Sequence, residues 1–188
     1  MYNIILEVLS TFFVFVAIST FPAKNYIFIG KHKFHKYFIA NIAFSIANLL
    51  MIIYSSINGF IPLLIQMIIF MLLGLKGIKE YSNNKQIFHF FYVAFIGTLM
   101  FSLFLMLKKN YNFNVTLIEI IAASFALGGS IFMNIYKNYI VMFLFYIIAD
   151  ILYLLFFFKN NSYIMVFQYF VFVLVGIISL YKEILRKR

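Results

Sequence analysis

The sequence predicts an all-α polytopic membrane protein with seven transmembrane helices, arranged as two parallel three-helix repeats joined by a linking helix. Three observations support this fold class. First, 65% of the 188 residues are hydrophobic and 11% are charged, with a mean hydropathy of +1.03, whereas soluble domains are about half apolar and about a quarter charged. Second, the apolar residues form runs of bilayer-spanning length. Third, the two ends of the chain are similar to one another.

Seven apolar runs are separated by short polar segments. Each run is close to the roughly 20 residues that a helix needs to cross a bilayer. The short connections predict one transmembrane domain over residues 1–188, composed of repeat 1 (1–82), a linking helix (83–112) and repeat 2 (113–185). The predicted spans are 4–21, 37–54, 60–78, 87–107, 115–136, 138–158 and 163–181.

The basic residues lie mostly on one side of this predicted arrangement. Twelve of the 15 Lys and Arg follow the first, third, fifth or seventh span, and only Lys108, Lys109 and Lys159 follow the others. Because cytoplasmic loops carry the excess of Lys and Arg, the N-terminus is expected outside and the C-terminus in the cytoplasm. The net charge of +10 therefore reflects membrane topology, and we expect a lipid bilayer and no nucleic acid as the partner.

The two ends of the chain match at a constant shift. A shift of 102 residues brings spans two and three onto spans six and seven. The fourth span returns the chain to its starting side, so both copies run in the same direction. Parallel repeats of this kind occur in transporters, which bind solute near the midplane where the repeats meet. The matching pairs are Asn48 with Asp150, Gln66 with Gln168, Phe70 with Phe172, and Gly74 with Gly176, while Glu7 matches Glu119 at a shift of 112 because the first connection is longer.

Polar residues recur on one face of spans two and six. A polar stripe at membrane depth must face protein or water. An ionisable residue such as Asp150, within an otherwise apolar run, is a functional candidate by default. Helix packing is the alternative, since Asn, Gln, Ser and Gly also join helices. The stripes are Asn41, Ser45, Asn48 and Ser55 in span two, and Tyr146, Asp150 and Tyr153 in span six.

These stripes and the third helix of each repeat supply the predicted solute-binding residues. We expect aromatic rings to sandwich a flat solute, and amides and a carboxylate to bind its polar groups, in a cleft shared by the two repeats. Asp150 is the strongest acceptor and a candidate counter-ion for a cationic ring. The predicted binding residues are Asn48, Gln66, Phe70, Tyr146, Asp150, Tyr153, Gln168 and Phe172.

Other polar and small residues fit structural roles. Ala122, Ala126 and Ser130 have the spacing of close helix packing. Glu7 and Glu119 lie near the outer ends of their spans, where they could reach the membrane surface, complement a helix N-terminus or bond to the second helix of each repeat. The chain has no Cys, and its three His lack a third ligand at metal-binding spacing. We therefore expect no metal site, cofactor or catalytic residue.

The chain resembles the PnuC-type vitamin transporters, which have two SWEET-like three-helix bundles and a linking helix. The likeness covers nearly the whole chain and is clearest in IEIIAASFALGGSIFMNIYKN, FYIIADILYLLFFFKNNSY and VFQYFVFVLVGIISLYKE. Members carry an aromatic residue before an Asp in span six, and a Gln, an aromatic residue and a Gly in span seven. Tyr146, Asp150, Gln168, Phe172 and Gly176 stand at those positions, and Gln66 and Gly74 match in the first half.

The resemblance implies facilitated diffusion of nicotinamide riboside or a related vitamin-like molecule, with trapping by a cytoplasmic kinase. It also implies a bacterial-type inner (plasma) membrane and a homo-oligomer, a trimer. The chain departs from the family because it has no Trp. Tyr146 stands where nicotinamide riboside transporters carry Trp, and Phe143 where they carry Asn. Thiamine, riboflavin and a deoxynucleoside therefore stay open as solutes.

Three other function classes fit a small basic polytopic chain. A substrate-binding subunit of an energy-coupled vitamin importer needs an ATPase partner, and parallel repeats are not expected in such a subunit. A non-transporting accessory or immunity protein is a further alternative. An enzyme is disfavoured because intramembrane catalysis needs clustered acids, a metal site or a Ser/His dyad, and the five acidic residues are scattered. No glycine-rich phosphate-binding loop is present.

Overall fold

A computed structural model describes residues 2–20, 26–29, 32–81, 85–109, 116–136 and 138–186. The described residues form seven α-helices, one π-helical turn and two short strands. The chain divides into two compact units, Met1–Phe113 and Asn114–Arg188. Some basic residues that predict the orientation lie outside the described residues, namely Lys24, Lys31, Lys137, Lys187 and Arg188.

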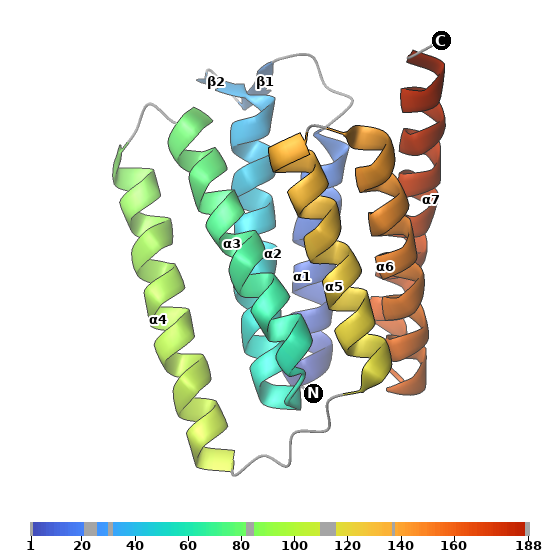
Figure 1. The fold of residues 1–188 in the computed structure, drawn as a ribbon. Helices are drawn as coiled ribbons and strands as arrows, with labels where there is room; N and C mark the ends of the chain where they lie inside the picture. The colour runs from blue at the N-terminus through green and yellow to red at the C-terminus, as the bar shows by residue number, and fades with distance from the viewer. Residues whose placement is uncertain are drawn as a thin grey trace. The chain divides into compact units, whose positions relative to one another are not determined.

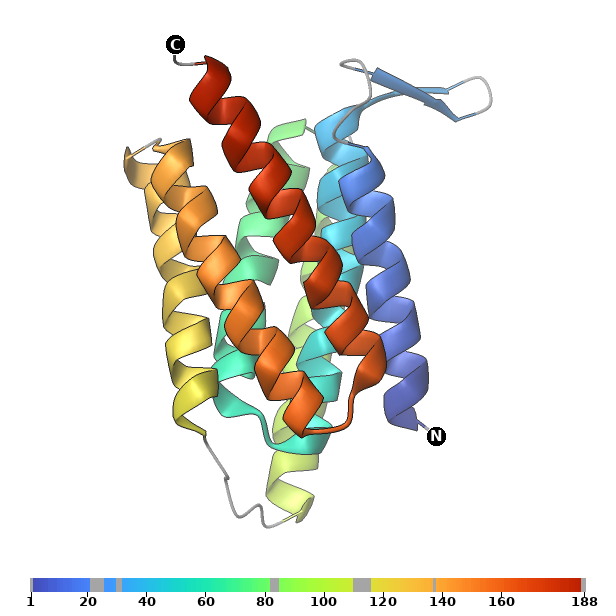
Figure 2. The ribbon, with the colours of Figure 1, turned by 90° about the vertical axis from the view of Figure 1, so that its right-hand side faces the viewer.

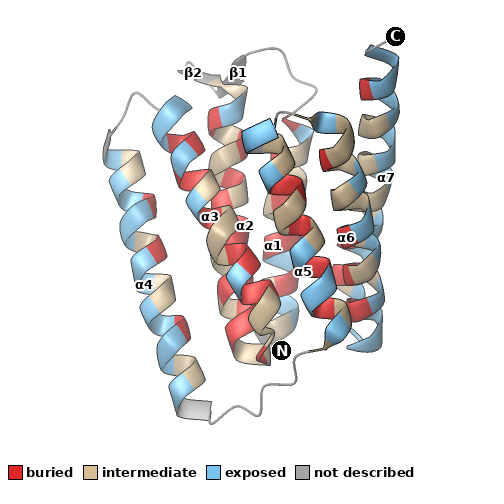
Figure 3. Ribbon diagram, in the orientation of Figure 1, coloured by how far each residue is buried: buried red, intermediate tan, exposed pale blue. Residues whose placement is uncertain are grey.

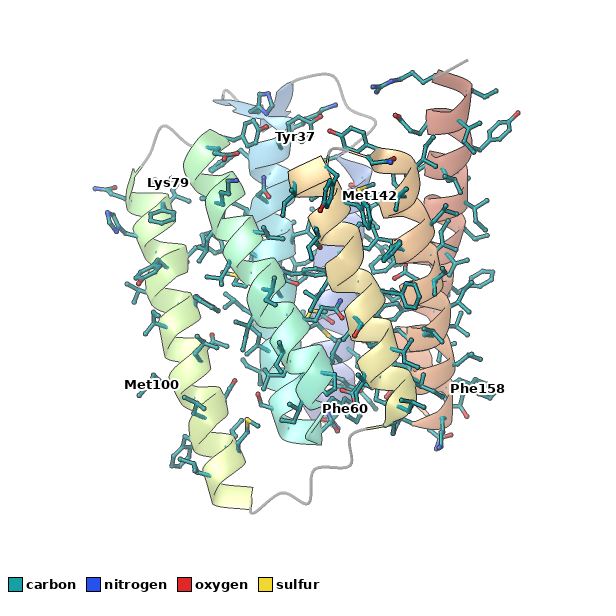
Figure 4. The ribbon with its side chains drawn as sticks, in the orientation of Figure 1. Tyr37, Phe60, Lys79, Met100, Met142 and Phe158 are labelled. Carbon is teal, nitrogen blue, oxygen red and sulfur yellow. The ribbon has the colours of Figure 1, made fainter. Side chains whose placement is uncertain are left out.

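Unit 1 is a four-helix assembly centred on α2. It comprises α1 (Tyr2–Ser19), α2 (Lys36–Asn58), α3 (Ile61–Tyr81) and α4 (Lys85–Lys109). Helix α2 packs against each of the other three helices (Figure 1). Its neighbour α4 is apolar on every side and buries only a narrow stripe, so Met100 points away from the unit (Figure 4). The buried residues of α4 are Phe91, Phe95 and Ser102.

A β-hairpin precedes α2 in unit 1. Strands β1 (Tyr26–Ile29) and β2 (His32–His35) pair antiparallel and extend from the end of α2 (Figure 2). The β1 sequence, Tyr-Ile-Phe-Ile, consists of aromatic and β-branched residues, which favour strands. The sequence predicts only a connection between the spans 4–21 and 37–54 here. The prediction of an all-α protein therefore holds for the helices, and the hairpin is a small addition to them.

Unit 2 is a three-helix assembly centred on α6. It comprises α5 (Leu117–Ile131), the π-helical turn η1 (Phe132–Tyr136), α6 (Tyr139–Lys159) and α7 (Tyr163–Arg186), and α6 packs against α5 and α7. The predicted span 115–136 is therefore not one continuous α-helix. The backbone N–H of Phe132 donates to the carbonyls of both Gly128 and Gly129, and the π-helical turn begins at Phe132.

The helices confirm a polytopic membrane protein. Among the described residues, five helices are long and apolar enough to cross a membrane, namely α2, α3, α4, α6 and α7. Helices α1 and α5 are shorter and also apolar. The outward surfaces of the helices carry large exposed apolar side chains, such as Phe90 and Leu107 on α4 and Phe170 on α7. Buried residues form stripes along the packed faces (Figure 3), so apolar side chains cover both the interior and the outer surface, as hydrocarbon requires.

The turn that joins the second and third helices is the same in both units. Each turn has one residue in the left-handed region, Gly59 (φ 74°) in unit 1 and Asn161 (φ 57°) in unit 2. The preceding Asn58 and Asn160 each donate a side-chain bond of 2.8 Å to the carbonyl four residues earlier. All these pairs are related by the shift of 102 residues, so the sequence repeat extends to backbone geometry.

Equivalent glycines mark where the second and third helices cross. A Cβ atom added to Gly74 would lie 2.6 Å from the Ser45 hydroxyl, and one added to Gly176 would lie 2.8 Å from Ile147 Cγ1. Ser45 and Ile147 are also 102 residues apart. The same close crossing therefore occurs in both units, and both glycines serve helix packing.

The buried faces of the two units coincide as well. At a shift of 112, the buried residues of α1 fall on buried residues of α5, and both sets include a glutamate. At a shift of 102, all five buried residues of α6 fall on buried residues of α2. The α1 set is Glu7, Ser10, Thr11, Val14 and Ala17, and the α5 set is Glu119, Ala122, Ala123, Ala126 and Gly129. The α6 set is Met142, Ala149, Tyr153, Phe156 and Phe157.

Candidate functional site

Three residues of the polar stripe of α2, Ser45, Asn48 and Ser55, are buried, and Asn41 at its start is partly exposed. The stripe residues differ in whether their side chains have a hydrogen-bond partner. Asn41 donates to the Tyr37 carbonyl at 2.6 Å, and Ser55 donates to the Met51 carbonyl at 2.7 Å. Asn48 is 7% exposed, yet its side chain has no hydrogen bond to any described residue. The stripe thus faces the protein, and its central amide has bonding capacity that the fold does not use.

Asp150 is the equivalent of Asn48 in unit 2. It lies near the middle of α6 and is half-buried. Within the described part of the chain, its carboxylate has neither a hydrogen bond nor an ion pair. Since an intramembrane carboxylate is costly unless it is paired or faces a cavity, Asp150 and Asn48 are the two strongest candidates for contact with a solute.

Tyr146 is anchored one helical turn before Asp150. Its hydroxyl lies 2.9 Å from the Ser130 Oγ, and its ring lies against the backbone of Gly129, where an added Cβ would be 2.9 Å from Cε1. The ring is half-buried. The small residues of α5 therefore hold an aromatic ring one helical turn before Asp150, which agrees with the packing role predicted for Ser130.

The Tyr153 ring packs between α6 and α7. It is fully buried, and its ring centroid lies 5.1 Å from that of Tyr169 and 6.1 Å from that of Phe157. Phe172 meets Tyr169 edge-on at 5.5 Å and is half-buried. In this arrangement Phe172 presents more of its surface than Tyr153, and the Tyr153 ring serves the packing between α6 and α7.

Gln66 and Gln168 are both 3% exposed, and each takes part in interactions within the protein. Their burial favours the packing alternative over direct solute contact. Phe70 is half-buried on α3, one turn before Gly74. Because α2 and α3 are antiparallel and cross at Ser45 and Gly74, Phe70 falls near the level of Asn48.

Glu7 and Glu119 are buried, although their positions near the outer ends of the spans also allowed them to reach the membrane surface. Glu7 is 5% exposed and Glu119 is 0% exposed, so neither reaches the membrane surface through an exposed side chain. Glu119 takes part in interactions within the protein. The signal in the sequence is their recurrence at a shift of 112.

The basic end of unit 1 holds an aromatic group. Tyr37 and Lys79 lie at this end, and Phe60 lies at the other (Figure 4). His35 stacks on Tyr81 at 4.8 Å and accepts a hydrogen bond from the Tyr37 backbone N–H. His35 is thus a helix cap. Among the described residues, no three His, Cys, Asp or Glu side chains are placed to hold a metal ion.

Neither a protein-family model, nor a curated protein, nor a solved structure matches this chain.

Proposed function

We propose that this protein is a membrane transporter that takes up nicotinamide riboside or a related vitamin-like aromatic solute by alternating access. The observation that carries the proposal is the pair Asn48 and Asp150. These two polar side chains stand at equivalent mid-helix positions in two similar units, and neither has a hydrogen-bond partner among the described residues.

Several other polar groups within the helices support this reading by contrast, although the buried hydroxyls of Ser45 and Ser102 also lack a hydrogen-bond partner among the described residues. Ser56 donates to the Ile52 carbonyl, Ser124 donates to the Ile120 carbonyl, and Ser130 bonds to Tyr146. Buried polar groups in proteins are normally satisfied in this way. A position that stays unsatisfied in both units has a purpose other than packing, and a polar solute would supply the missing bonds.

The proposed binding residues have distinct roles. Asn48 donates and accepts hydrogen bonds through its amide. Asp150 accepts hydrogen bonds, and Tyr146 offers the face of an anchored ring to a flat solute. Phe70 and Phe172 add apolar surface in the two units. Gln66, Tyr153 and Gln168 hold the helices that carry these side chains.

The proposed setting is a bacterial-type plasma membrane, with the N-terminus outside and the C-terminus in the cytoplasm. The supporting observation is the concentration of Lys and Arg after the odd-numbered spans. A cytoplasmic kinase that phosphorylates the solute would make uptake by facilitated diffusion irreversible. Reporter fusions at each terminus, assayed on both sides of the membrane, test the orientation.

Uptake by the purified chain in lipid vesicles tests the function. We expect labelled nicotinamide riboside, thiamine, riboflavin or a deoxynucleoside to enter, and Asn48→Ala and Asp150→Ala each to reduce the uptake rate by about tenfold or more. Each loses bonds worth roughly 1.5–3 kcal/mol when a charged group takes part. Ser124→Ala is the matched control, since that exposed serine bonds only within its own helix.

Three results would contradict the proposal. Unchanged uptake in both Ala variants would remove the site assignment. Binding of a solute without uptake by the chain alone would instead favour a substrate-binding subunit that needs an ATPase. Neither binding nor uptake of any of the four solutes would favour an accessory or immunity protein.

A further inference from the structure

The end of unit 1 where α2 begins and α3 ends carries a cluster of three aromatic rings. The His35 ring stacks on the Tyr81 ring with centroids 4.8 Å apart, and the Tyr37 ring lies 5.4 Å from that of Tyr81 and 5.2 Å from that of His35. Tyr37 and Tyr81 are nevertheless 39% and 42% exposed. The cluster therefore joins the two helix ends and still presents aromatic surface to the surroundings.

Two lysines accompany these rings. The Lys36 ammonium lies 5.2 Å from the centroid of the Tyr37 ring, which is a cation–π distance. Lys79 is exposed at the same end of unit 1 (Figure 4) and forms no ion pair with any described residue. Glu80, in the last turn of α3, is paired with Lys76 at 3.8 Å. The net charge of the described side chains beside the rings is therefore positive.

The cluster lies at the depth of the lipid headgroups. Helices α2 and α3 are both long and apolar enough to cross a membrane, and the rings and lysines occupy the start of α2 and the last turn of α3. Tyr rings and Lys side chains are favoured at this depth. Strand β2 runs directly into α2, and the hairpin projects sideways from the helices (Figure 2), so it extends this end of unit 1 along the same layer.

Unit 2 has different residues at the equivalent positions. Neither lysine is repeated, and a carboxylate, which repels an anion, stands in place of the second tyrosine. The combination of rings and lysines is therefore a feature of unit 1. At the shift of 102 residues, the equivalents of Lys36, Tyr37, Lys79 and Tyr81 are Asn138, Tyr139, Tyr181 and Glu183.

From this combination we infer that the cluster of His35, Lys36, Tyr37, Lys79 and Tyr81 binds the headgroup of an anionic phospholipid. The two lysines attract the phosphate, and the two tyrosine hydroxyls donate hydrogen bonds to it. A lipid is the occupant that fits, because the positive charge lies where the membrane itself places phosphate groups. The inference concerns the lipid around unit 1 and is independent of the proposed transport function.

The test uses a single tryptophan as a reporter, because the chain has none. Tyr37→Trp keeps an amphipathic ring in the cluster. Its fluorescence in vesicles is quenched either by brominated phosphatidylglycerol, which is anionic, or by brominated phosphatidylcholine, which has no net charge. We expect the anionic lipid to be enriched at the reporter about tenfold over the neutral lipid, since each basic residue near an anionic surface raises the affinity about fivefold.

Removal of the two lysines should abolish this enrichment. With Tyr37→Trp in place, Lys36→Gln combined with Lys79→Gln is expected to lower it by about tenfold. Lys108→Gln combined with Lys109→Gln removes the same charge where α4 ends, at the opposite end of unit 1 (Figure 1), and should leave it unchanged. Lys79→Gln alone, at an exposed side chain, should give a smaller loss and serves if the double variant does not fold.

Four outcomes would overturn the inference. Equal quenching by the two lipids around Tyr37→Trp would show that the cluster does not select an anionic headgroup. An equal loss in the two double variants would show diffuse attraction by net charge in place of binding at the cluster. Displacement of the anionic lipid by inorganic phosphate, beyond that caused by sodium chloride of equal ionic strength, would identify a free anion as the occupant. Displacement by polyglutamate would identify an acidic protein segment.

Discussion

The two units share a scaffold but fill it with different chemistry. In unit 1 the equivalents of Tyr153 and Tyr169 are Met51 and Met67, and the equivalent of Phe157 is Ser55. Helix α4 covers α2 and α3 in unit 1, and 56% of the apolar stretch of α2 is buried against 28% for α6. The interior of unit 1 is therefore mainly aliphatic, contains several buried polar side chains and is covered by a fourth helix, whereas the interior of unit 2 is richer in aromatic rings.

The difference teaches which positions are set by geometry and which by function. Some equivalent positions hold Met in unit 1 and Tyr in unit 2, and one holds Ser in unit 1 and Phe in unit 2. At these positions the residue type follows the packing space in each unit. Asn48 and Asp150 are an equivalent pair in which both residues are polar and both lack a hydrogen-bond partner among the described residues, whereas Ser45, which also lacks one, is matched by the apolar Ile147. The comparison thus separates the scaffold from the candidate site more clearly than either unit does alone.

The helix crossings are where the shared scaffold should break most easily. Gly74→Leu is expected to destabilise the protein by about 3 kcal/mol or to prevent folding, because a side chain there meets the Ser45 hydroxyl at the α2–α3 contact. Gly176→Leu should cost less, since α7 is more exposed than α3 and can shift. Thermal unfolding in detergent measures both. Gly97→Leu is the matched control, because nothing lies within 4 Å of a Cβ added at Gly97.

Substitutions at the two left-handed turn residues should change the free energy of unfolding by smaller amounts, with opposite signs in the two units. Gly59→Ala should destabilise by about 1–2 kcal/mol, because a Cβ atom is unfavourable at positive φ. Asn161→Gly should stabilise by less than about 1 kcal/mol, since Gly adopts that conformation at no steric cost. Denaturation of the two variants beside Gly97→Ala measures the difference. A cost for Asn161→Gly as large as that for Gly59→Ala would show that the turns are not equivalent.

The bond between Ser130 and Tyr146 gives a similarly small effect and tests a contact that is present in unit 2 alone of the two units. Its equivalents in unit 1 are Ile18 and Phe44, which cannot form such a bond. Ser130→Ala should cost about 1 kcal/mol, and Ser124→Ala, at an exposed serine, should cost less. A double-mutant cycle with Tyr146→Phe isolates the pair. A coupling energy near zero would mean that the hydroxyl bond does not hold the ring.

The helices and the repeat could be predicted from the sequence, because both are encoded in the type and spacing of side chains along the chain. Hydropathy is read directly from side chains, and each apolar run of the sequence corresponds to a helix in the structure. The shift of 102 residues was visible from Asn48, Gln66 and Gly74 alone. The π-helical turn at Phe132 and the β-hairpin before α2 were not anticipated, because each depends on backbone hydrogen bonds that composition does not encode.

The sequence by itself determined that the chain is a membrane protein of duplicated helices and that Asp150 is out of place in an apolar run. Only the tertiary structure decided which polar residues have partners. It buried Gln66, Gln168, Glu7 and Glu119, and it enclosed Tyr153 in aromatic packing. It left Asn48 and Asp150 without hydrogen-bond partners among the described residues. The physical reason is that lipid and protein interior are equally apolar. Hydrophobicity therefore identifies a helix in the membrane but not the face by which it packs.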